Sequence, residues 1–415
     1  MTKTLTRVLM VSTEYPPMQG GVGRYTSNLT RELRKIGYEV DVACNEKGDG
    51  NVFGLSPDNS DNSGVLLKIV DKVHPDIVHV QFEHGLYGIV LDPLNPKKTI
   101  TNIDSFYEMC KVPIVTTFHS AYSFKEWMNL VVPLKRAGWT GKVGVLVGML
   151  KAYWEHLLNY KSFHKLNKDK LGRSQAGIVF SNHLSKMIGG GEVIYHGAES
   201  FMSVRPTKKE ARAKFSLPQE GRLALALGFR TATKGWDVLE KMKVPDGWSI
   251  VVSSSKNHYN KENLNLQLER NNNIIVLDRD FLSEKDLALL FYASDAIVLP
   301  YKVSSGSGVM FDALAHGLPF VATDLEFFKE FSTQGVGITV KRDSNEFSNG
   351  LVAIERGYAN YKESVDIFKK KLRWDVIAKQ HANVYSRILE KEGDIIAAST
   401  IVLRKARTNT IATTH

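Results

Sequence analysis

Residues 299–322 read LPYKVSSGSGVMFDALAHGLPFVA, and this stretch shows most clearly how the chain folds. An apolar run ends at Pro300, a loop of serines and glycines follows, and an apolar helical pattern begins at about Val309. Small side chains and the unpaired N–H groups of a helix start suit a phosphate group. Asp312 lies four residues after Gly308, one turn into the helix and on the same face, where a carboxylate could accept both hydroxyls of a ribose. The alternative is a helix whose acidic first turn only complements its dipole.

The rest of the chain repeats this alternation of short apolar strands and helical segments. A strand over 7–13 and a glycine-rich turn lead into a helix over about 22–36. In the first half, further strands are predicted at 39–44, 76–81, 113–118, 177–181 and 193–196. In the second half, strands are predicted at 222–228, 248–255, 273–278 and 296–301, and helices after Lys234 and at about 284–293, 308–316 and 345–371. The pattern predicts an α/β protein with two doubly wound parallel sheets, whose ligands bind in the cleft between the domains.

The length of 415 residues suits two domains of about 200 residues each. A polar, basic segment with two prolines near 200–218 is the predicted join. We therefore predict an N-terminal domain, a C-terminal domain, a closing helix and a tail, which span 1–198, 199–372, 373–395 and 396–415.

The composition is typical of a soluble globular protein, with 43% hydrophobic and 24% charged residues. No apolar run approaches the ~20 residues that cross a bilayer. The apolar segment of a secretory signal is not found behind Lys3 and Arg7. The two cysteines, Cys44 and Cys110, do not call for a disulfide framework or a cysteine-rich metal site. We expect a cytoplasmic protein.

Two further loops join a strand to a helix and carry residues suited to anions. The first, QGGVGR at 19–24, has glycines that let the backbone approach a charged group, although a plain tight turn explains it equally well. The second, GFRTATKG at 228–235, places the cations Arg230 and Lys234 on one loop. Paired cations stabilise a diphosphate as it leaves, and the alternative is two ordinary surface cations.

Positive charge is concentrated in the segment 121–173, which holds ten Lys or Arg and three Asp or Glu. Apolar residues at helical spacing and aromatic residues lie among these lysines, namely Trp127, Trp139, Leu146, Leu150, Tyr153, Trp154 and Leu157. An amphipathic basic helix of this kind can lie on an anionic membrane. The alternative is that the apolar stripe packs into the domain core or an oligomer interface. The membrane hypothesis would place the protein at the inner face of the membrane.

The ordered motifs resemble those of glycosyltransferase family 4, a retaining family with the two-domain GT-B fold. The resemblance covers roughly 1–395, and its last motif is similar to the family's closing helix, which crosses back to the first domain. The matching segments, in order, are GGVGRY, HPDIVHVQ, TTFHS, IYHGAE, ALGFRTATKGWDVL, PYKVSSGSGVMFDALAHGLP and LRWDVIAKQHANVYSRIL. The resemblance implies a hexosyltransferase-type enzyme that uses a nucleotide-diphosphate sugar, with UDP- and GDP-sugars both open, and no metal or other cofactor.

The resemblance also implies roles for individual residues. Lys234 and Arg230 would hold the diphosphate. Asp312 would bind the ribose, and His119 would contact the transferred sugar. The other donor-side candidates are Gly20, Gly21, Ser304, Ser307, Gly308 and Val309, and the acceptor-side candidates are Glu83 and His84. Members of the family are thought to react by front-side attack, in which the leaving phosphate accepts the acceptor's proton and no protein nucleophile is needed.

The chain departs from the family pattern at several positions. Ser304 stands where the family has the first glutamate of its Glu-x7-Glu motif, Phe229 where it has arginine, and His196 where it has asparagine. Other GT-B activities, such as epimerisation of the sugar nucleotide or phosphorolysis, therefore stay open, as does a non-catalytic protein that binds sugar nucleotide or glycan. The acceptor is a sugar, a glycan or a lipid-linked molecule.

Two other functions are not expected. The Asp-x-Asp sequence at 278–280 has the form of a metal-binding motif, but it follows a strand where the family has a polar turn, so we predict no metal there. A nucleic acid partner is not expected either, because the basic cluster is a single insertion.

Overall fold

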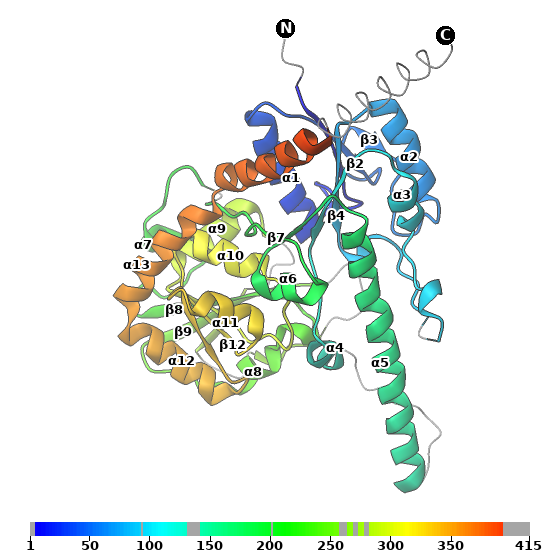
Figure 1. Ribbon diagram of the computed structural model, residues 1–415. Coiled ribbons are helices and arrows are strands. Elements are labelled where there is room, and N and C mark those ends of the chain that lie inside the picture. The colour runs from blue at the N-terminus through cyan, green and yellow to red at the C-terminus, as the bar shows by residue number, and fades with distance from the viewer. Residues whose placement is uncertain are drawn as a thin grey trace, which may run out of the picture.

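The computed structural model describes residues 5–92, 94–130, 142–200, 202–256, 264–268, 273–277 and 282–392. These residues form two α/β domains, each built on a parallel sheet with helices on both of its faces (Figure 1). The prediction of two doubly wound parallel sheets is therefore confirmed.

The described part of the first domain contains a seven-stranded parallel sheet in the order β3-β2-β1-β4-β5-β6-β7. Its strands are β1 (Arg7–Val11), β2 (Glu39–Cys44), β3 (Val52–Phe53), β4 (Ile77–Phe82), β5 (Ile114–Phe118), β6 (Ala176–Val179) and β7 (Glu192–Val193). Its helices are α1 (Gly21–Lys35), α2 (Asn62–Val73), α3 (Asp104–Met109), α4 (Phe124–Leu130), α5 (Lys142–Gly172) and α6 (Asn182–Ile188). The strand order reverses between β1 and β4, which is where ligands bind in sheets of this kind.

The described part of the second domain contains a six-stranded parallel sheet in the order β10-β9-β8-β11-β12-β13. Its strands are β8 (Arg222–Phe229), β9 (Trp248–Ser255), β10 (Ile274–Leu277), β11 (Ala296–Leu299), β12 (Phe320–Thr323) and β13 (Gly337–Val340). Its helices are α7 (Lys208–Lys214), α8 (Trp236–Lys241), α9 (Glu284–Ala293), α10 (Gly308–Ala315), α11 (Glu326–Ser332), α12 (Ser344–Arg356) and α13 (Tyr358–Phe368). Its order reverses between β8 and β11.

One helix was predicted too long. The sequence predicts a single helix over 345–371, but the structure has α12 and α13 with Gly357 between them. The N–H of Gly357 closes the last turn of α12 on Ala353, and the same glycine is the N-cap of α13. Glycine has a low helix propensity, so the chain changes direction there at little cost.

A C-terminal helix over 374–392 returns from the second domain and crosses the first (Figure 1). Its apolar side chains, including Trp374, Ile377 and Tyr385, join one buried cluster with Val8 and Leu33 of the first domain. Burial of apolar surface against both β1 and α1 therefore ties the last described helix to the opposite end of the chain. Residues 396–415 lie outside the described residues.

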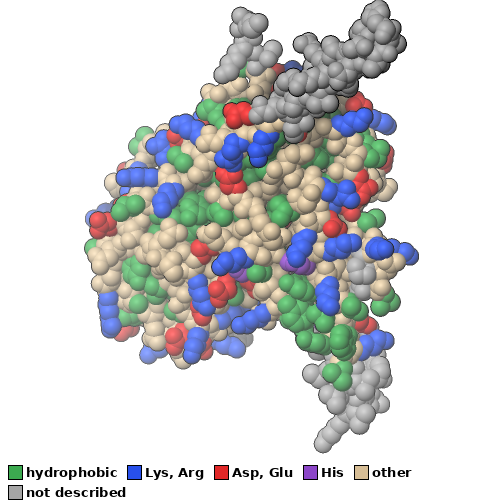
Figure 2. Space-filling model, viewed as in Figure 1, with side chains coloured by type: hydrophobic (Ala, Val, Ile, Leu, Met, Phe, Trp, Pro, Cys, Tyr) green, Lys and Arg blue, Asp and Glu red, His purple; other side chains and the backbone are tan. Residues whose placement is uncertain are grey.

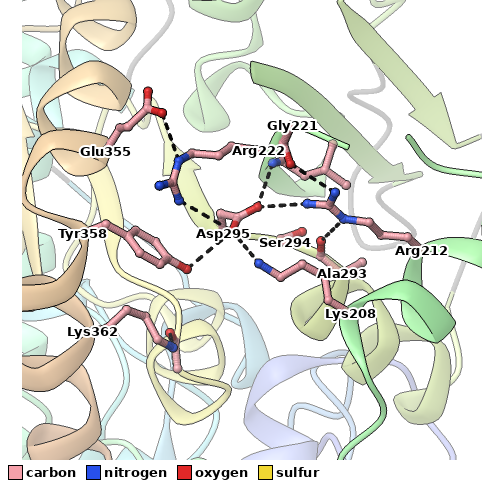
Figure 3. A network of polar contacts seen from close by, with 12 residues as sticks. Lys208, Arg212, Gly221, Arg222, Ala293, Ser294, Asp295, Glu355, Tyr358 and Lys362 are labelled. Atoms are coloured by element: carbon pink, nitrogen blue, oxygen red, sulfur yellow. Dashed lines mark hydrogen bonds and ion pairs between the residues drawn. The ribbon is translucent and has the colours of Figure 1, made fainter. Parts of the chain in front are cut away.

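The second domain also has a buried ionic cluster around Asp295, which follows α9 (Figure 3). One carboxylate oxygen accepts from Arg212 at 3.0 Å and from the N–H of Leu223 at 2.9 Å. The other oxygen accepts from Lys208 at 2.5 Å. Arg212 also donates to four backbone carbonyl groups, those of Ala293, Pro218, Gln219 and Gly221. This cluster joins α7 and α9 to the start of β8.

The basic segment between β5 and β6 forms α4 and the long helix α5. The residues 131–141 between these helices, Trp139 among them, lie outside the described residues. The C-terminal part of α5 packs on the first domain, where Phe163 and Leu166 are buried. The opposite end projects well beyond the body of the molecule (Figure 1). The apolar stripe thus packs into the domain over only part of its length. None of the described helices is long and apolar enough to span a bilayer.

Candidate active site

Most of the predicted site residues lie after the carboxyl ends of strands next to the two switch points. Gly20 and Gly21 follow β1, Glu83 and His84 follow β4, and His119 follows β5. In the second domain, Arg230 and Lys234 follow β8, and the serine–glycine loop with Ser304, Ser307 and Gly308 follows β11. Carboxyl ends of parallel strands share one edge of a sheet, and both of these edges face the inter-domain cleft.

A cavity of about 360 Å³ lies between the two domains. The first domain contributes Gly20, Gly21 and Arg24 to its wall. The second domain contributes, among others, Gly228, Phe229, Ser253, Ser255, Glu284, Phe291, Val309 and Asp312. The apolar and aromatic side chains with a few polar groups are what a nucleotide-sized pocket needs.

Arg24 of α1 and Asp312 of α10 form an ion pair across this cavity. The Asp312 side chain is 4% exposed and that of Arg24 is 27% exposed. The negative charge of Asp312 is the main cause that raises the pKa of Arg24. The carboxylate that the sequence assigns to ribose is therefore held by an arginine of the other domain in this structure.

The start of α1 is also occupied by a carboxylate. Glu14, which is buried, accepts a hydrogen bond of 2.7 Å from the N–H of Gly23. A Cβ built on Gly20 would lie 1.9 Å from the Glu14 carboxylate, so a larger residue there would displace that carboxylate. The predicted glycine-rich loop thus lets a protein carboxylate approach the helix start, and Gly20 and Gly21 present backbone to the cavity.

The two predicted cations, Arg230 and Lys234, lie at the edge of the cavity and are not part of its wall. The aliphatic part of Lys234 passes beside Gly228, which has a φ of +152° and does line the cavity. The Lys234 ammonium lies 4.0 Å from the centroid of the Tyr301 ring, in a cation–π contact. Arg230 donates from Nε to Ser254 Oγ at 3.1 Å. Both side chains thus come from the loop that borders the cavity.

The start of α10 provides backbone donors. Ser307 caps the helix, and its hydroxyl accepts from the N–H of Met310 at 3.2 Å. The N–H groups of Gly308 and Val309 are in the first turn, where a helix has no acceptor of its own, and Val309 lines the cavity. Ser304, which replaces the family glutamate, donates to the carbonyl of Gly306 at 3.1 Å and so shapes the loop.

His119 and His196 lie beside each other around Tyr25 of α1. Tyr25 meets the His119 ring edge to face at 5.3 Å and the His196 ring at 5.0 Å. Burial, and then the neighbouring His196, lower the pKa of His119 to about 3. Burial lowers the pKa of His196 to about 4. Both rings are therefore neutral at physiological pH, able to accept and donate one hydrogen bond each.

The two acceptor-side candidates differ in position. Glu83 is half-buried, and burial raises the pKa of its carboxyl, while backbone N–H groups of His84 and Gly85 act in the opposite direction. His84 is buried and stacks on Phe163 of α5 at 3.8 Å. Burial lowers the pKa of His84 to about 3. His84 is a packing residue of the α5 interface, and neither residue is part of the wall of the 360 Å³ cavity.

Sequence reasoning did not single out Arg24, Glu14 or Glu284 as site residues. Arg24 stands in the quoted GGVGRY motif, but its partner is 288 positions away. Glu284 was predicted only as a helix start. The residues 278–280 lie outside the described residues. Among the described residues there is no group of three His, Cys, Asp or Glu side chains that could hold a metal ion.

Sequence models of two known glycosyltransferase groups match this chain. The sequence model for Glycosyltransferase Family 4 matches residues 19–160, and the model for Glycosyl transferases group 1 matches residues 228–356. The chain belongs to the family 4-like glycosyltransferases with the GT-B fold. The family match confirms the resemblance drawn from the motifs. The first match covers the α1 side of the cavity, and the second covers the β8 and β11 loops.

Individual relatives of this glycosyltransferase are distant. An uncharacterized glycosyltransferase of Methanocaldococcus jannaschii, MJ1607, is 22% identical over 93% of this chain and 100% of its own. Sucrose-phosphate synthase from Thermosynechococcus elongatus has a TM-score of 0.64 at 15% identity, covering 93% of this chain and all of its own. Anabaena Alr3699/HepE, solved in complex with UDP, has a TM-score of 0.61 at 14% identity, covering 92% of this chain and all of its own. These structures share the fold.

Proposed function

We propose that this glycosyltransferase moves a hexose from a nucleotide-diphosphate sugar to an acceptor hydroxyl, with retention of the anomeric configuration. The observation that carries the proposal is the cavity between the domains, which has Val309 and Asp312 of α10 on its wall and Arg230 and Lys234 on the loop at its edge. Retention rests on the family resemblance.

The reaction breaks the bond between the anomeric carbon and the diphosphate, and the leaving group takes the negative charge. Arg230 and Lys234 supply two positive charges to that group, and the first-turn N–H groups of Gly308 and Val309 supply donors at a helix start. In front-side attack, the leaving phosphate oxygen takes the proton from the acceptor hydroxyl while the new glycosidic bond forms on the same face. The chain then contributes charge and orientation, and His119 orients the transferred sugar.

The UDP complex of Anabaena Alr3699/HepE supports a uridine nucleotide as the first one to test. A thermal-shift panel of UDP- and GDP-sugars with the free nucleotides identifies the donor, because a ligand that binds only the folded protein raises its melting temperature. Incubation with the donor alone separates the competing activity, because an epimerase changes the sugar nucleotide without an acceptor. A protein that shows no shift with any nucleotide sugar contradicts the proposal.

We further propose that the projecting end of α5 binds an anionic membrane surface and brings a lipid-linked acceptor to the cleft. Leu150, Tyr153 and Trp154 are 53%, 45% and 59% exposed, and they lie on adjacent positions of one helical face next to Lys151. Figure 2 shows hydrophobic side chains gathered where this segment leaves the body. Exposed aromatic and aliphatic side chains beside lysines fit an acidic lipid surface. Flotation with vesicles of anionic phospholipid at low salt tests this partner.

A further inference from the structure

A line of buried polar side chains connects His119 to the C-terminal helix. It starts at His119, passes through Gln81 and His79 on β4, and ends at Tyr385 of the helix over 374–392. His79 and Gln81 are two positions apart on one strand, so their side chains point to the same face of the sheet. Both are fully buried, at 0% exposure, as is Tyr385. A buried polar chain of this kind exists only where its members satisfy one another.

The first link fixes which atoms face each other. His119 Nε2 lies 2.9 Å from Gln81 Oε1, and Gln81 Nε2 lies 3.2 Å from the sulfur of Met10. A thioether sulfur can only accept a hydrogen bond. The amide NH₂ of Gln81 must therefore face Met10, because the flipped amide would set two acceptors against each other. The oxygen of Gln81 then faces His119, so His119 Nε2 carries the proton.

The remaining links run in the same direction. Gln81 Nε2 lies 3.3 Å from His79 Nε2, which accepts. The proton of the His79 ring is then on Nδ1, which donates to Tyr385 Oη at 2.6 Å. The Thr117 hydroxyl of β5, 2.8 Å from His79 Nε2, donates to the same lone pair, which Thr117 and Gln81 therefore share. The N–H groups of His119, Gln81 and His79 that form this chain thus each have an acceptor.

We propose that Gln81 is a positioning residue that holds His119 as the Nε2–H tautomer and leaves its Nδ1 as a hydrogen-bond acceptor for a hydroxyl of the bound sugar. This inference rests on the proposed function for the identity of the ligand. Among the residues that the structure describes, Nδ1 of His119 has no hydrogen-bond partner, and His119 is partly exposed. A neutral imidazole with a fixed acceptor discriminates a hydroxyl from a carbonyl or ether oxygen, because only the hydroxyl can donate.

The returning helix over 374–392 also supports the site. The Tyr385 hydroxyl accepts the last bond of the chain, and His381 on the same helix lies 3.2 Å from the hydroxyl of Tyr25, whose ring contacts His119. The helix from the end of the chain thus supports the His119 ring from two sides, through Gln81 and through Tyr25. A second layer of partners that orients a functional imidazole is a general feature of such sites.

The test is nitrogen NMR of protein labelled with ¹⁵N-histidine, in which the two tautomers have distinct shifts. A His119→Gln variant identifies the His119 signals. We expect wild-type His119 to be protonated on Nε2 without any ligand, and Gln81→Met, which removes the amide at similar volume, to give a mixture of tautomers. A Gln81→Glu variant keeps an acceptor oxygen and should keep the proton on Nε2. Protonation of wild-type His119 on Nδ1 overturns the inference.

Kinetics separate this inference from the proposed function. We expect Gln81→Met to lower kcat/KM for the donor about tenfold, the loss of one buried hydrogen bond. The control is Thr116→Val on β5, which removes a buried hydroxyl that bonds Tyr107 on the opposite face. An unchanged kcat/KM in Gln81→Met, or an unchanged His119 tautomer in that variant, contradicts the role of Gln81 even where transfer occurs. If no donor binds wild-type protein, the proposed function fails while the tautomer result stands.

Discussion

Arg24 and Asp312, which lie on α1 and α10 in different domains, form an ion pair across the central cavity. Asp312 is almost fully buried, and the ion pair with Arg24 offsets the cost of burying its carboxylate. The pair also links the domains at the position where the resemblance places the ribose. A nucleotide that enters the cavity therefore has to share the Asp312 carboxylate with Arg24 or displace it.

Replacement of Arg24 should make the thermal stability of the protein depend more on bound donor. In Arg24→Met the buried Asp312 carboxylate loses its partner, so we expect the free energy of unfolding to fall by about 1–3 kcal/mol. The ribose hydroxyls of a bound nucleotide can restore hydrogen bonds to Asp312, so the donor should raise the melting temperature more in the variant than in the wild type. Thermal unfolding with and without nucleotide sugar measures both.

The control is Arg31→Met. Arg31 is an exposed arginine of the same helix that pairs with Glu32, so this variant should behave like wild type. An equal donor shift in Arg24→Met and wild type contradicts the shared carboxylate.

Acid should destabilise the protein through its buried histidines. The pKa values of His84 and His119 are lowered to about 3, and those of His196 and His381 to about 4, in each case mainly by burial. Below pH ~6.5 the unfolded chain binds protons that the folded protein does not, so the free energy of unfolding falls as the pH falls from ~6.5 toward those values. Above pH ~6.5 the contribution of these neutral histidines to the free energy of unfolding is fully present.

Denaturant unfolding at pH 7.5 and pH 5 checks this expectation. We expect a lower midpoint at pH 5, and a smaller loss in His381→Gln than in wild type, because that variant has one fewer histidine to protonate. A wild-type midpoint that is the same at both pH values would show that these rings already carry protons in the folded state.

The ionic cluster of the second domain should be a large contributor to its stability. Arg212→Met leaves four carbonyl groups and the buried Asp295 carboxylate without the guanidinium (Figure 3), so we expect a loss of about 3–5 kcal/mol. Lys209→Met is the control, because this lysine is exposed on the same helix α7. Chemical unfolding followed by far-ultraviolet circular dichroism measures the difference. Equal stability of the two variants would mean that the cluster adds no net free energy.

If α5 binds an anionic membrane, a negative charge on its exposed face should weaken that binding. Trp154→Glu places a negative charge on the exposed apolar face, so flotation with anionic vesicles should fall several-fold while thermal stability stays the same. Val204→Glu serves as the control, because Val204 is 75% exposed and belongs to the second domain. Wild-type protein that stays with the unbound fraction at low salt, or a Trp154→Glu variant that floats as well as wild type, argues against this surface.

The sequence predicts the bounds of a strand or helix correctly where its local signals match what the fold buries. The predicted strand at 39–44 and the predicted helix at 284–293 have the bounds of β2 and α9. β2 alternates polar and apolar residues, and α9 starts behind Ser283, whose hydroxyl accepts from the N–H of Asp286. The predicted helix at 345–371 failed at Gly357, because its apolar spacing continues across the break while the helix does not.

The contacts across the cleft could not be predicted from local patterns. Arg24 and Asp312 are each ordinary helix residues until the two domains meet, and Glu14 reads as part of a turn until its carboxylate reaches the start of α1. Gln81 lies in a quoted motif, HPDIVHVQ, but only the fold brings it to His119. Pairings between distant segments depend on the tertiary arrangement, whereas strand and helix signals depend on neighbouring residues.

The binding of a nucleoside diphosphate, compared with the matching monophosphate, tests the central claim most directly. Titration calorimetry with UDP and UMP, or with GDP and GMP where guanine gives the larger thermal shift, measures what the second phosphate adds. We expect wild type to prefer the diphosphate clearly, and Lys234→Ala to lose that preference about tenfold or more, as charged hydrogen bonds predict. Lys241→Ala, an exposed lysine on α8, should keep it. A diphosphate preference of the same size in Lys234→Ala and wild type would contradict the assignment of this cleft to a leaving diphosphate.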